Sequence, residues 1–394
     1  MTYPTVRIQP GRDKRLRAGS PWLYSNELEM DTAARAIEPG SLVRVMAGQG
    51  KIMGVAHFNP HSLIAGRMLT RNKDATIDAG YFETRIARAL TLREQLFDAP
   101  FYRLVHAEGD GLPGLVVDRF GEYLAVQFNT AGMQAMAPTI VDALSGILRP
   151  AGIVARNDAP VRELEGLALE SGTIAGDVPQ RVEIAENGIR HLIAPVSGQK
   201  TGWYYDQRAN RAFAARLAVG RRALDLYAYA GGFALAALAA GASSAMAIDR
   251  SAEALDLARE SAALQGLDGA LETRRADVFE ALGGLIDDRQ RFGLVIADPP
   301  PFVRAKKDLA AGLRGYRKLA RTAASVVTEP GFLALGCCSH AVNPSAFLAE
   351  VWAGIKAAGR GGRLIQAAGA AADHPVHPGL PETAYLKFLV FALD

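Results

Sequence analysis

The stretch that decides the fold is Ala223-Leu-Asp-Leu-Tyr-Ala-Tyr-Ala-Gly-Gly-Phe233, in which an apolar run reaches Asp225 and leads to Gly231 and Gly232. We interpret the run as a buried strand and Phe233 to Ala240 as the following helix. Glycines at such a turn let the backbone approach a ligand closely. The full G-x-G-x-x-G pattern is missing, which disfavours a dinucleotide pyrophosphate. An acid here would repel a phosphate but attract an ammonium group.

Strands and helices alternate from about residue 186 to the end of the chain, which predicts an α/β domain with a doubly wound, mainly parallel sheet. Four acids follow four successive strands: Asp225, Asp249, Asp277 and Asp298. Ligands of such sheets bind beyond the carboxyl ends of the strands. There Asp249 could accept hydrogen bonds from both ribose hydroxyls and Asp277 could bind an adenine amino group. Each acid taken singly is more often a helix cap or turn residue, but four of them in this order fit S-adenosylmethionine.

The chain's only cysteines, Cys337 and Cys338, end the apolar run Gly331 to Gly336. A thiol and the carboxylate of Asp298 at neighbouring strand ends suggest a nucleophilic site. The alternative is that the cysteines are buried core, as free cysteines often are. Adjacent cysteines form no disulfide framework, which favours a reducing compartment and hence the cytoplasm. We find no signal peptide and no membrane segment.

Two further regions precede the alternating one. Residues 1–73 consist of short strand-like runs and turns, and carry eleven Lys/Arg against five Asp/Glu, a net charge of +6. This balance suits a polyanion such as nucleic acid, with a solvated charged face as the alternative. Residues 74–185 begin with a helix over Ala79 to Phe97 and continue as strand, strand, helix and strand, a small α+β domain. The third predicted domain is 186–394.

The third region resembles the class I S-adenosylmethionine-dependent methyltransferases. The whole chain resembles the branch that joins an N-terminal β-rich PUA-like domain and a central small α+β domain to that Rossmann-like fold. The stretches that carry the resemblance include Glu186-Asn-Gly188, Gln199 to Arg208, Asp298 to Lys306, Cys338-Ser339 and Ala371 to Val376. The best-known members methylate carbon 5 of a cytosine in large-subunit ribosomal RNA. The resemblance therefore implies S-adenosylmethionine as cofactor, ribosomal RNA as partner, a homodimer, and no metal ion.

The resemblance also implies roles for individual residues. Cys338 would be the nucleophile that adds to carbon 6 of the base, and Asp298 would hydrogen-bond the cytosine edge. The implied cofactor-binding residues are Lys200, Tyr205, Gln207, Arg208, Asp225, Tyr229, Gly231, Gly232, Asp249, Asp277 and Asp298. The implied substrate-binding residues are Pro299, Pro300, Phe302 and Lys306. Relatives commonly have Lys where this chain has Pro301, and often Ser and Gly where Cys337 and His340 flank the Cys338-Ser339 pair.

Several alternatives stay open at this point. The same fold could methylate carbon 5 of uracil, or form 7-methylguanine, which requires no thiol. A dehydrogenase would also use Asp249 on a ribose, but the missing third glycine and the Asp298-Pro-Pro turn argue against it. A non-catalytic RNA-binding or assembly protein would leave the set of acids and the thiol unexplained. Trp203, Tyr204 and Tyr205 could be core packing, Lys306 a surface lysine, and His374 structural.

Overall fold

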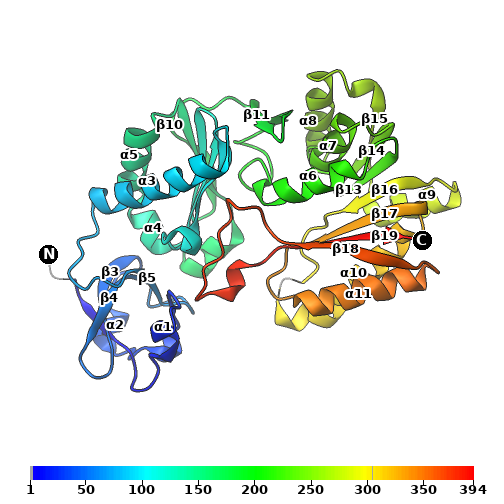
Figure 1. The fold of residues 1–394 in the computed structure, drawn as a ribbon. Helices are drawn as coiled ribbons and strands as arrows, with labels where there is room; N and C mark the ends of the chain where they lie inside the picture. Colours follow the sequence, from blue (N-terminus) through cyan, green and yellow to red (C-terminus); the bar gives the residue numbers. More distant parts are fainter. Residues whose placement is uncertain (1–2, 304) are drawn as a thin grey trace. The chain divides into compact units, whose positions relative to one another are not determined.

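The computed structural model describes residues 3–303 and 305–394, and the chain folds into two compact units (Figure 1). The first unit comprises Met1–Val182, Ala194–Trp203 and Ala372–Thr383. The second comprises Glu183–Ile193, Tyr204–Ala371 and Ala384–Asp394. No helix among the described residues is long and apolar enough to span a membrane.

The N-terminal part of the first unit is built on a five-stranded sheet with the order β1-β3-β4-β5-β2. Its strands are β1 (Thr5–Arg7), β2 (Trp22–Leu23), β3 (Ser41–Met46), β4 (Ile52–Phe58) and β5 (Gly66–Thr70). Its helices are the short α1 (Lys14–Arg17), α2 (Thr32–Arg35) and η1 (Ser25–Glu27). Alternate residues such as Val43 and Val45 point into one apolar core, as the period of two of a strand requires.

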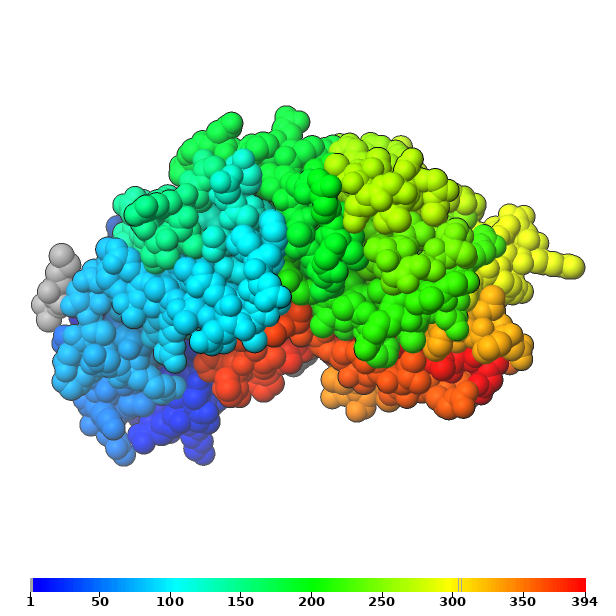
Figure 2. Space-filling model, turned by 45° about the horizontal axis from the view of Figure 1, so that its top comes forward, coloured from blue at the N-terminus to red at the C-terminus, as the bar shows by residue number. Residues whose placement is uncertain are grey.

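A second five-stranded sheet, with the order β10-β9-β8-β7-β6, forms the rest of the first unit. Its strands are β6 (Phe101–His106), β7 (Leu115–Phe120), β8 (Tyr123–Phe128), β9 (Gly152–Asn157) and β10 (Glu170–Gly176). The helices are α3 (Ala79–Leu96), α4 (Ala131–Ala135), α5 (Ala137–Leu148), η2 (Ala107–Asp110), η3 (Pro160–Glu165) and η7 (Pro381–Thr383). Asp78 caps α3 by accepting from the Tyr81 amide at 3.1 Å. The outer face of α3 is exposed in Figure 2.

The second unit holds a seven-stranded sheet with the order β15-β14-β13-β16-β17-β19-β18. Its strands are β13 (Arg222–Leu226), β14 (Ser244–Asp249), β15 (Leu271–Arg275), β16 (Phe292–Ala297), β17 (Val327–Cys337), β18 (Gly362–Ala368) and β19 (Lys387–Leu393). All neighbours from β15 to β17 pair in parallel, and β19 runs antiparallel to both β17 and β18. The predicted mainly parallel α/β sheet is therefore confirmed.

Helices cover both faces of this sheet. They are α6 (Arg208–Arg216), α7 (Gly232–Ala239), α8 (Ala252–Ala263), α9 (Val278–Asp287), α10 (Leu309–Ala324) and α11 (Pro344–Ala357), with η4 (Tyr205–Gln207), η5 (Asp268–Ala270) and η6 (Lys306–Asp308). A separate two-stranded sheet pairs β11 (Val182–Glu186) with β12 (Ile189–Ile193). The division into domains 1–73, 74–185 and 186–394 stays a prediction.

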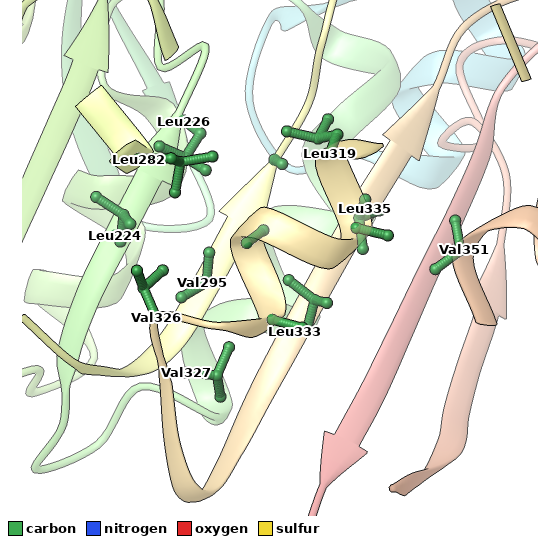
Figure 3. Close-up of a cluster of buried hydrophobic side chains, with 14 of the residues drawn as sticks. Leu224, Leu226, Leu282, Val295, Leu319, Val326, Val327, Leu333, Leu335 and Val351 are labelled. Carbon is green, nitrogen blue, oxygen red and sulfur yellow. The ribbon is translucent and has the colours of Figure 1, made fainter. Parts of the chain in front are cut away.

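The alternation of side chains along each strand assigns residues to one layer or the other. Leu224, Val295 and Leu333 pack with residues of α9, α10 and α11 in one buried cluster (Figure 3). Ala223 and Leu294, one position away on their strands, pack instead with α6, α7 and α8. Because the sheet is apolar on both faces, its polar side chains gather where the strands end.

Candidate active site

The carboxylate of Asp225 lies at the end of β13 and is fully buried. Its Oδ2 accepts from the Ala234 amide at 2.9 Å, in the first turn of α7. Its Oδ1 has no hydrogen-bond partner among the residues that the structure describes. Burial raises the pKa of Asp225 to about 7, and the negative charges of Asp298 and Asp249 act in the same direction. A buried carboxylate oxygen without a hydrogen-bond donor is stabilised by a cationic or hydrogen-bond-donating ligand beside it.

The loop between β13 and α7 turns sharply and positions Asp249. Tyr227, Tyr229 and Gly231 have φ values of 61°, 48° and 72°, in the left-handed region that side chains rarely adopt. This geometry aims the Tyr229 amide at Asp249 Oδ2, at 2.9 Å, while Oδ1 accepts from the Ser251 amide at 2.9 Å. Each carboxylate oxygen keeps a second lone pair. Asp249 is therefore fixed in orientation and still able to accept from a ligand hydroxyl.

Asp277 caps the helix that follows β15. Its Oδ1 accepts from the amides of Phe279 at 2.9 Å and Glu280 at 3.2 Å, and its Oδ2 pairs with the exposed Arg250. Burial alone would raise the pKa of Asp277, but the bonds from Arg250 and from the backbone hold it below its usual range. The carboxylate thus serves the helix start, and its contact with an adenine amino group stays a prediction.

Asp298 follows β16 and is held from two sides. Gln207 Nε2 donates to Asp298 Oδ2 at 2.8 Å, and the same Gln207 accepts from Asn210 Nδ2 through Oε1 at 2.6 Å. Gly336 of β17 leaves the room for the carboxylate, because a Cβ there would lie 2.2 Å from Asp298 Oδ1. The resemblance implied Gln207 as a cofactor-binding residue, which stays a prediction; in the structure its side-chain amide donates to Asp298.

The two cysteines have different surroundings. Cys337, the last residue of β17, is fully buried and belongs to the cluster that packs against α10 and α11. Cys338 follows the strand and is partly exposed, and its Sγ lies 3.9 Å from the Pro299 carbonyl oxygen. Because neighbouring residues of an extended chain point to opposite sides, one thiol enters the core while the other stays at the sheet edge.

The turn after Asp298 forms a wall beside Cys338. Pro299 is buried whereas Pro300 is exposed. The ring of Phe302 packs on Tyr316 of α10, with ring centroids 4.7 Å apart, and the Phe302 amide donates to the Tyr316 hydroxyl at 3.4 Å. The segment is fixed further by Ser339, whose hydroxyl donates to the Val303 carbonyl at 2.7 Å. Lys306 begins η6, and its side chain lies outside the described residues.

The segment that precedes α6 brings the rings of Tyr204 and Tyr205 to the edge of the sheet where Asp298 and Cys338 lie. Tyr205 is buried beneath the guanidinium of Arg208, which lies 5.2 Å from its ring centroid. Tyr204 packs edge-on against Tyr229, with centroids 5.4 Å apart. Burial first, and then neighbouring charges that include Asp298 and Cys338, raise the pKa of Tyr204. Tyr204 therefore lies near both proposed catalytic groups, Asp298 and Cys338. The sequence alone was equally consistent with core packing of Tyr204.

A buried ion pair anchors this segment. Arg211 donates to both carboxylate oxygens of Glu186, at 2.6 Å and 2.9 Å, and to the Tyr204 carbonyl at 2.7 Å. Arg208 lies 3.7 Å from the same carboxylate. These contacts give the Glu186-Asn-Gly188 stretch a structural role, since they tie η4 and α6 to β11.

Two predicted residues belong to the first unit. Lys200 lies there with a φ of 49°, and its role toward a cofactor stays a prediction. His374 is also there, and its Nδ1 lies 2.9 Å from Asp373 Oδ1 in a buried pair, consistent with the structural alternative.

Lys387 is the residue that sequence reasoning missed. It starts β19 directly opposite Cys337 and is almost fully buried. Its Nζ donates to the carbonyls of Ser339 at 2.6 Å and Tyr385 at 2.9 Å. The sequence signal that could have identified it is a single lysine inside the apolar run Ala384 to Phe391. A lysine is rarely buried in such a strand unless its charge has a partner.

Comparison with known proteins agrees with this geometry. Residues 6–71 match a family model described as a PUA-like domain, and residues 169–391 match one described as an S-adenosylmethionine-dependent methyltransferase. The predicted PUA-like domain and the predicted cofactor are thereby confirmed.

Relatives and solved structures extend the match to the whole chain. A protein named ribosomal RNA large subunit methyltransferase I from Klebsiella pneumoniae (strain 342) is 34% identical over 98% of this chain and 97% of its own. One of the same name from Pseudoalteromonas atlantica is 37% identical over 98% of both chains. A putative SAM-dependent methyltransferase from Streptococcus mutans superposes with a TM-score of 0.83 at 20% identity, covering 99% of this chain and 100% of its own. The chain therefore belongs to the S-adenosylmethionine-dependent methyltransferases, in the family of the proteins named ribosomal RNA large subunit methyltransferase I.

Proposed function

We propose that this protein forms 5-methylcytosine in large-subunit ribosomal RNA through a covalent adduct on Cys338. The observation that carries the proposal is the separation of the two thiols, with Cys337 in the core and Cys338 at the edge where Asp298 also lies. The names of the full-length relatives support ribosomal RNA as the substrate class. We further propose a homodimer that works in the cytoplasm.

The residues around β13 and β14 fit S-adenosylmethionine. The cofactor's ammonium group would give Asp225 Oδ1 the donor that the described residues do not supply. Asp249, held by two backbone amides, would accept from the ribose hydroxyls. When bound, the cofactor supplies an electrophilic methyl group. The loop glycines Gly231 and Gly232 let the backbone come close to it.

Cys338 would activate a carbon that is otherwise a weak nucleophile. Its thiolate forms a bond to carbon 6 of cytosine, and the electron pair of the 5,6 double bond moves to carbon 5. Asp298 would hydrogen-bond ring nitrogen 3 and deliver a proton to it, so that the ring does not carry a full negative charge. After methylation of carbon 5, the proton on that carbon passes to solvent water and its bonding pair re-forms the 5,6 double bond. The sulfur–carbon bond then breaks and Cys338 recovers its electron pair as thiolate, while Asp298 takes back the proton from ring nitrogen 3.

The matched variants Cys338→Ala and Cys337→Ala test the proposal. Each removes one thiol, and only the first removes the exposed one. We expect Cys338→Ala to lose methyl transfer to large-subunit RNA, measured with radiolabelled cofactor, while Cys337→Ala retains it. Substrate that contains 5-fluorocytosine should trap an adduct with the wild type and not with Cys338→Ala. Methyl transfer by Cys338→Ala would contradict the covalent step.

The other base specificities remain distinct outcomes of the same assay. Mass spectrometry of the digested RNA product separates 5-methylcytosine from 5-methyluridine and 7-methylguanine. Formation of 7-methylguanine would make Cys338 dispensable, because a ring nitrogen attacks the methyl group without a covalent adduct. No methylated nucleoside with any ribosomal RNA or precursor subunit would favour a non-catalytic RNA-binding or assembly role.

A further inference from the structure

We propose that Lys387 is the positioning residue of the Cys338 thiol, holding the turn that carries it and supplying the positive charge that stabilises its thiolate. The proposal rests on the proposed function of Cys338 and assigns a role to a residue of the C-terminal strand. It concerns the second unit alone, to which both residues belong.

The strand order brings Lys387 next to the turn that carries Cys338. Because β19 pairs with β17, Lys387 lies directly opposite Cys337 in the register. Its Nζ reaches past the strand end and donates to the Ser339 carbonyl at 2.6 Å. The residue before Ser339 is Cys338, so this bond fixes the backbone on one side of the thiol. The Ser339 hydroxyl, bound to the Val303 carbonyl at 2.7 Å, fixes the same turn from the Asp298-Pro-Pro side.

Several titratable groups lie around the Cys338 thiol. Among the described residues they include Tyr204 before η4, Asp298 after β16, Tyr316 on α10, Cys337 on β17, and Lys387 on β19. Among these described side chains Lys387 carries the positive charge, and the side chain of Lys306 lies outside the part of the chain that the structure describes. The negative charge of the Asp298 carboxylate would disfavour ionisation of the thiol, because a like charge opposes the thiolate.

Lys387 and the thiols act on each other reciprocally. Burial lowers the pKa of Lys387, and negative charge on Cys337 and Cys338 acts in the opposite direction. The same attraction must favour the thiolate of Cys338 by an equal free energy. The two hydrogen bonds of Lys387 Nζ go to carbonyl oxygens, which only accept, and this suits an ammonium group. The nucleophile would thus be ionised near neutral pH, where a free thiol with a pKa of about 8.5 is mostly protonated.

The test measures the thiol directly. In a Cys337→Ala background Cys338 is the only cysteine of the chain, so iodoacetamide, whose iodide the thiolate displaces, reports Cys338 alone. We compare Lys387→Met with Lys387→Arg and with the control Lys356→Met, which removes an exposed lysine of α11. We expect Lys387→Met to raise the alkylation pKa by about one unit, equivalent to a tenfold lower rate below that pKa. Lys387→Arg and Lys356→Met should leave it close to that of the background.

A second readout links the thiol to catalysis. In Lys387→Met the acidic limb of the pH profile for methyl transfer should move upward by the same unit, so that activity returns as the pH rises. A merely structural loss would lower activity at every pH. If Lys387→Met does not fold, the Cys337→Ala protein by itself tests the proposal. An alkylation pKa of Cys338 at or above about 8.5 in that protein would overturn it. An unchanged pKa in folded Lys387→Met would overturn it too. Alkylation needs neither RNA nor cofactor, so a failure of the methyl-transfer proposal is seen separately, in Cys338→Ala.

Discussion

Substitution of Gly336 by alanine offers a direct test of the geometry around Asp298. The new Cβ would lie 2.2 Å from Asp298 Oδ1 and 3.2 Å from its Cγ. Carbon and oxygen atoms in contact need at least about 3.2 Å, so the carboxylate must retreat by about 1 Å. The carboxylate could then no longer keep its present position, in which Oδ2 accepts from Gln207 Nε2 at 2.8 Å.

The expected loss follows from that displacement. A misplacement of about 1 Å at a reacting group costs roughly 100-fold in rate, or about 2.7 kcal/mol of activation free energy. We therefore expect Gly336→Ala to lower kcat for methyl transfer about 100-fold. Cofactor binding through Asp225 and Asp249, measured by calorimetry, should change far less, because the new methyl group faces Asp298.

The matched control is Gly284→Ala in α9, where an added Cβ meets no atom within 4 Å. An alanine is favoured over glycine in a helix by roughly 0.5–1 kcal/mol, so this variant should be fully active and slightly more stable. Thermal unfolding of both variants shows whether the loss of activity reflects the site or the fold. Full activity in a folded Gly336→Ala would refute the assignment of Asp298 as a group whose position matters.

Two further predictions concern buried charge. Because the folded pKa of Asp225 is about 7 against an ordinary 3.8, its contribution to stability is fully present below about pH 4 and is lost as the pH rises through 7. Asp225→Asn should remove that component of the unfolding free energy, measured in urea across this range. A cofactor ammonium group favours the ionised acid, so binding at pH 6 should release close to one proton, seen as a buffer-dependent binding enthalpy that Asp225→Asn lacks. Arg211→Met should destabilise the protein by about 3–5 kcal/mol in chemical unfolding, because Glu186 is left buried without its bidentate partner. Arg190→Met, which breaks the exposed pair with Glu183, should have little effect, and equal losses from the two arginine variants would contradict the argument.

Much of the catalytic fold could be predicted because its signals are local. The apolar runs at Ala223 and Leu294 indicate buried strands, and the parallel arrangement brings their carboxyl ends to one edge. The acids Asp225, Asp249 and Asp298 could therefore be placed together without coordinates. Asp277 shows the limit, since a carboxylate after a strand also caps a helix, and the pattern cannot distinguish the two uses.

The sequence by itself determined the alternating sheet, the acids at its strand ends, and a thiol within reach of one of them. The tertiary structure decided which thiol is accessible and what lies opposite it. Cys337 and Cys338 differ because the strand ends between them, with one side chain in the core. Lys387 stands beside them only because β19 is inserted antiparallel between β17 and β18, a pairing between residues about fifty positions apart. Such non-local pairing depends on how the whole sheet assembles, and no local pattern of residues encodes it.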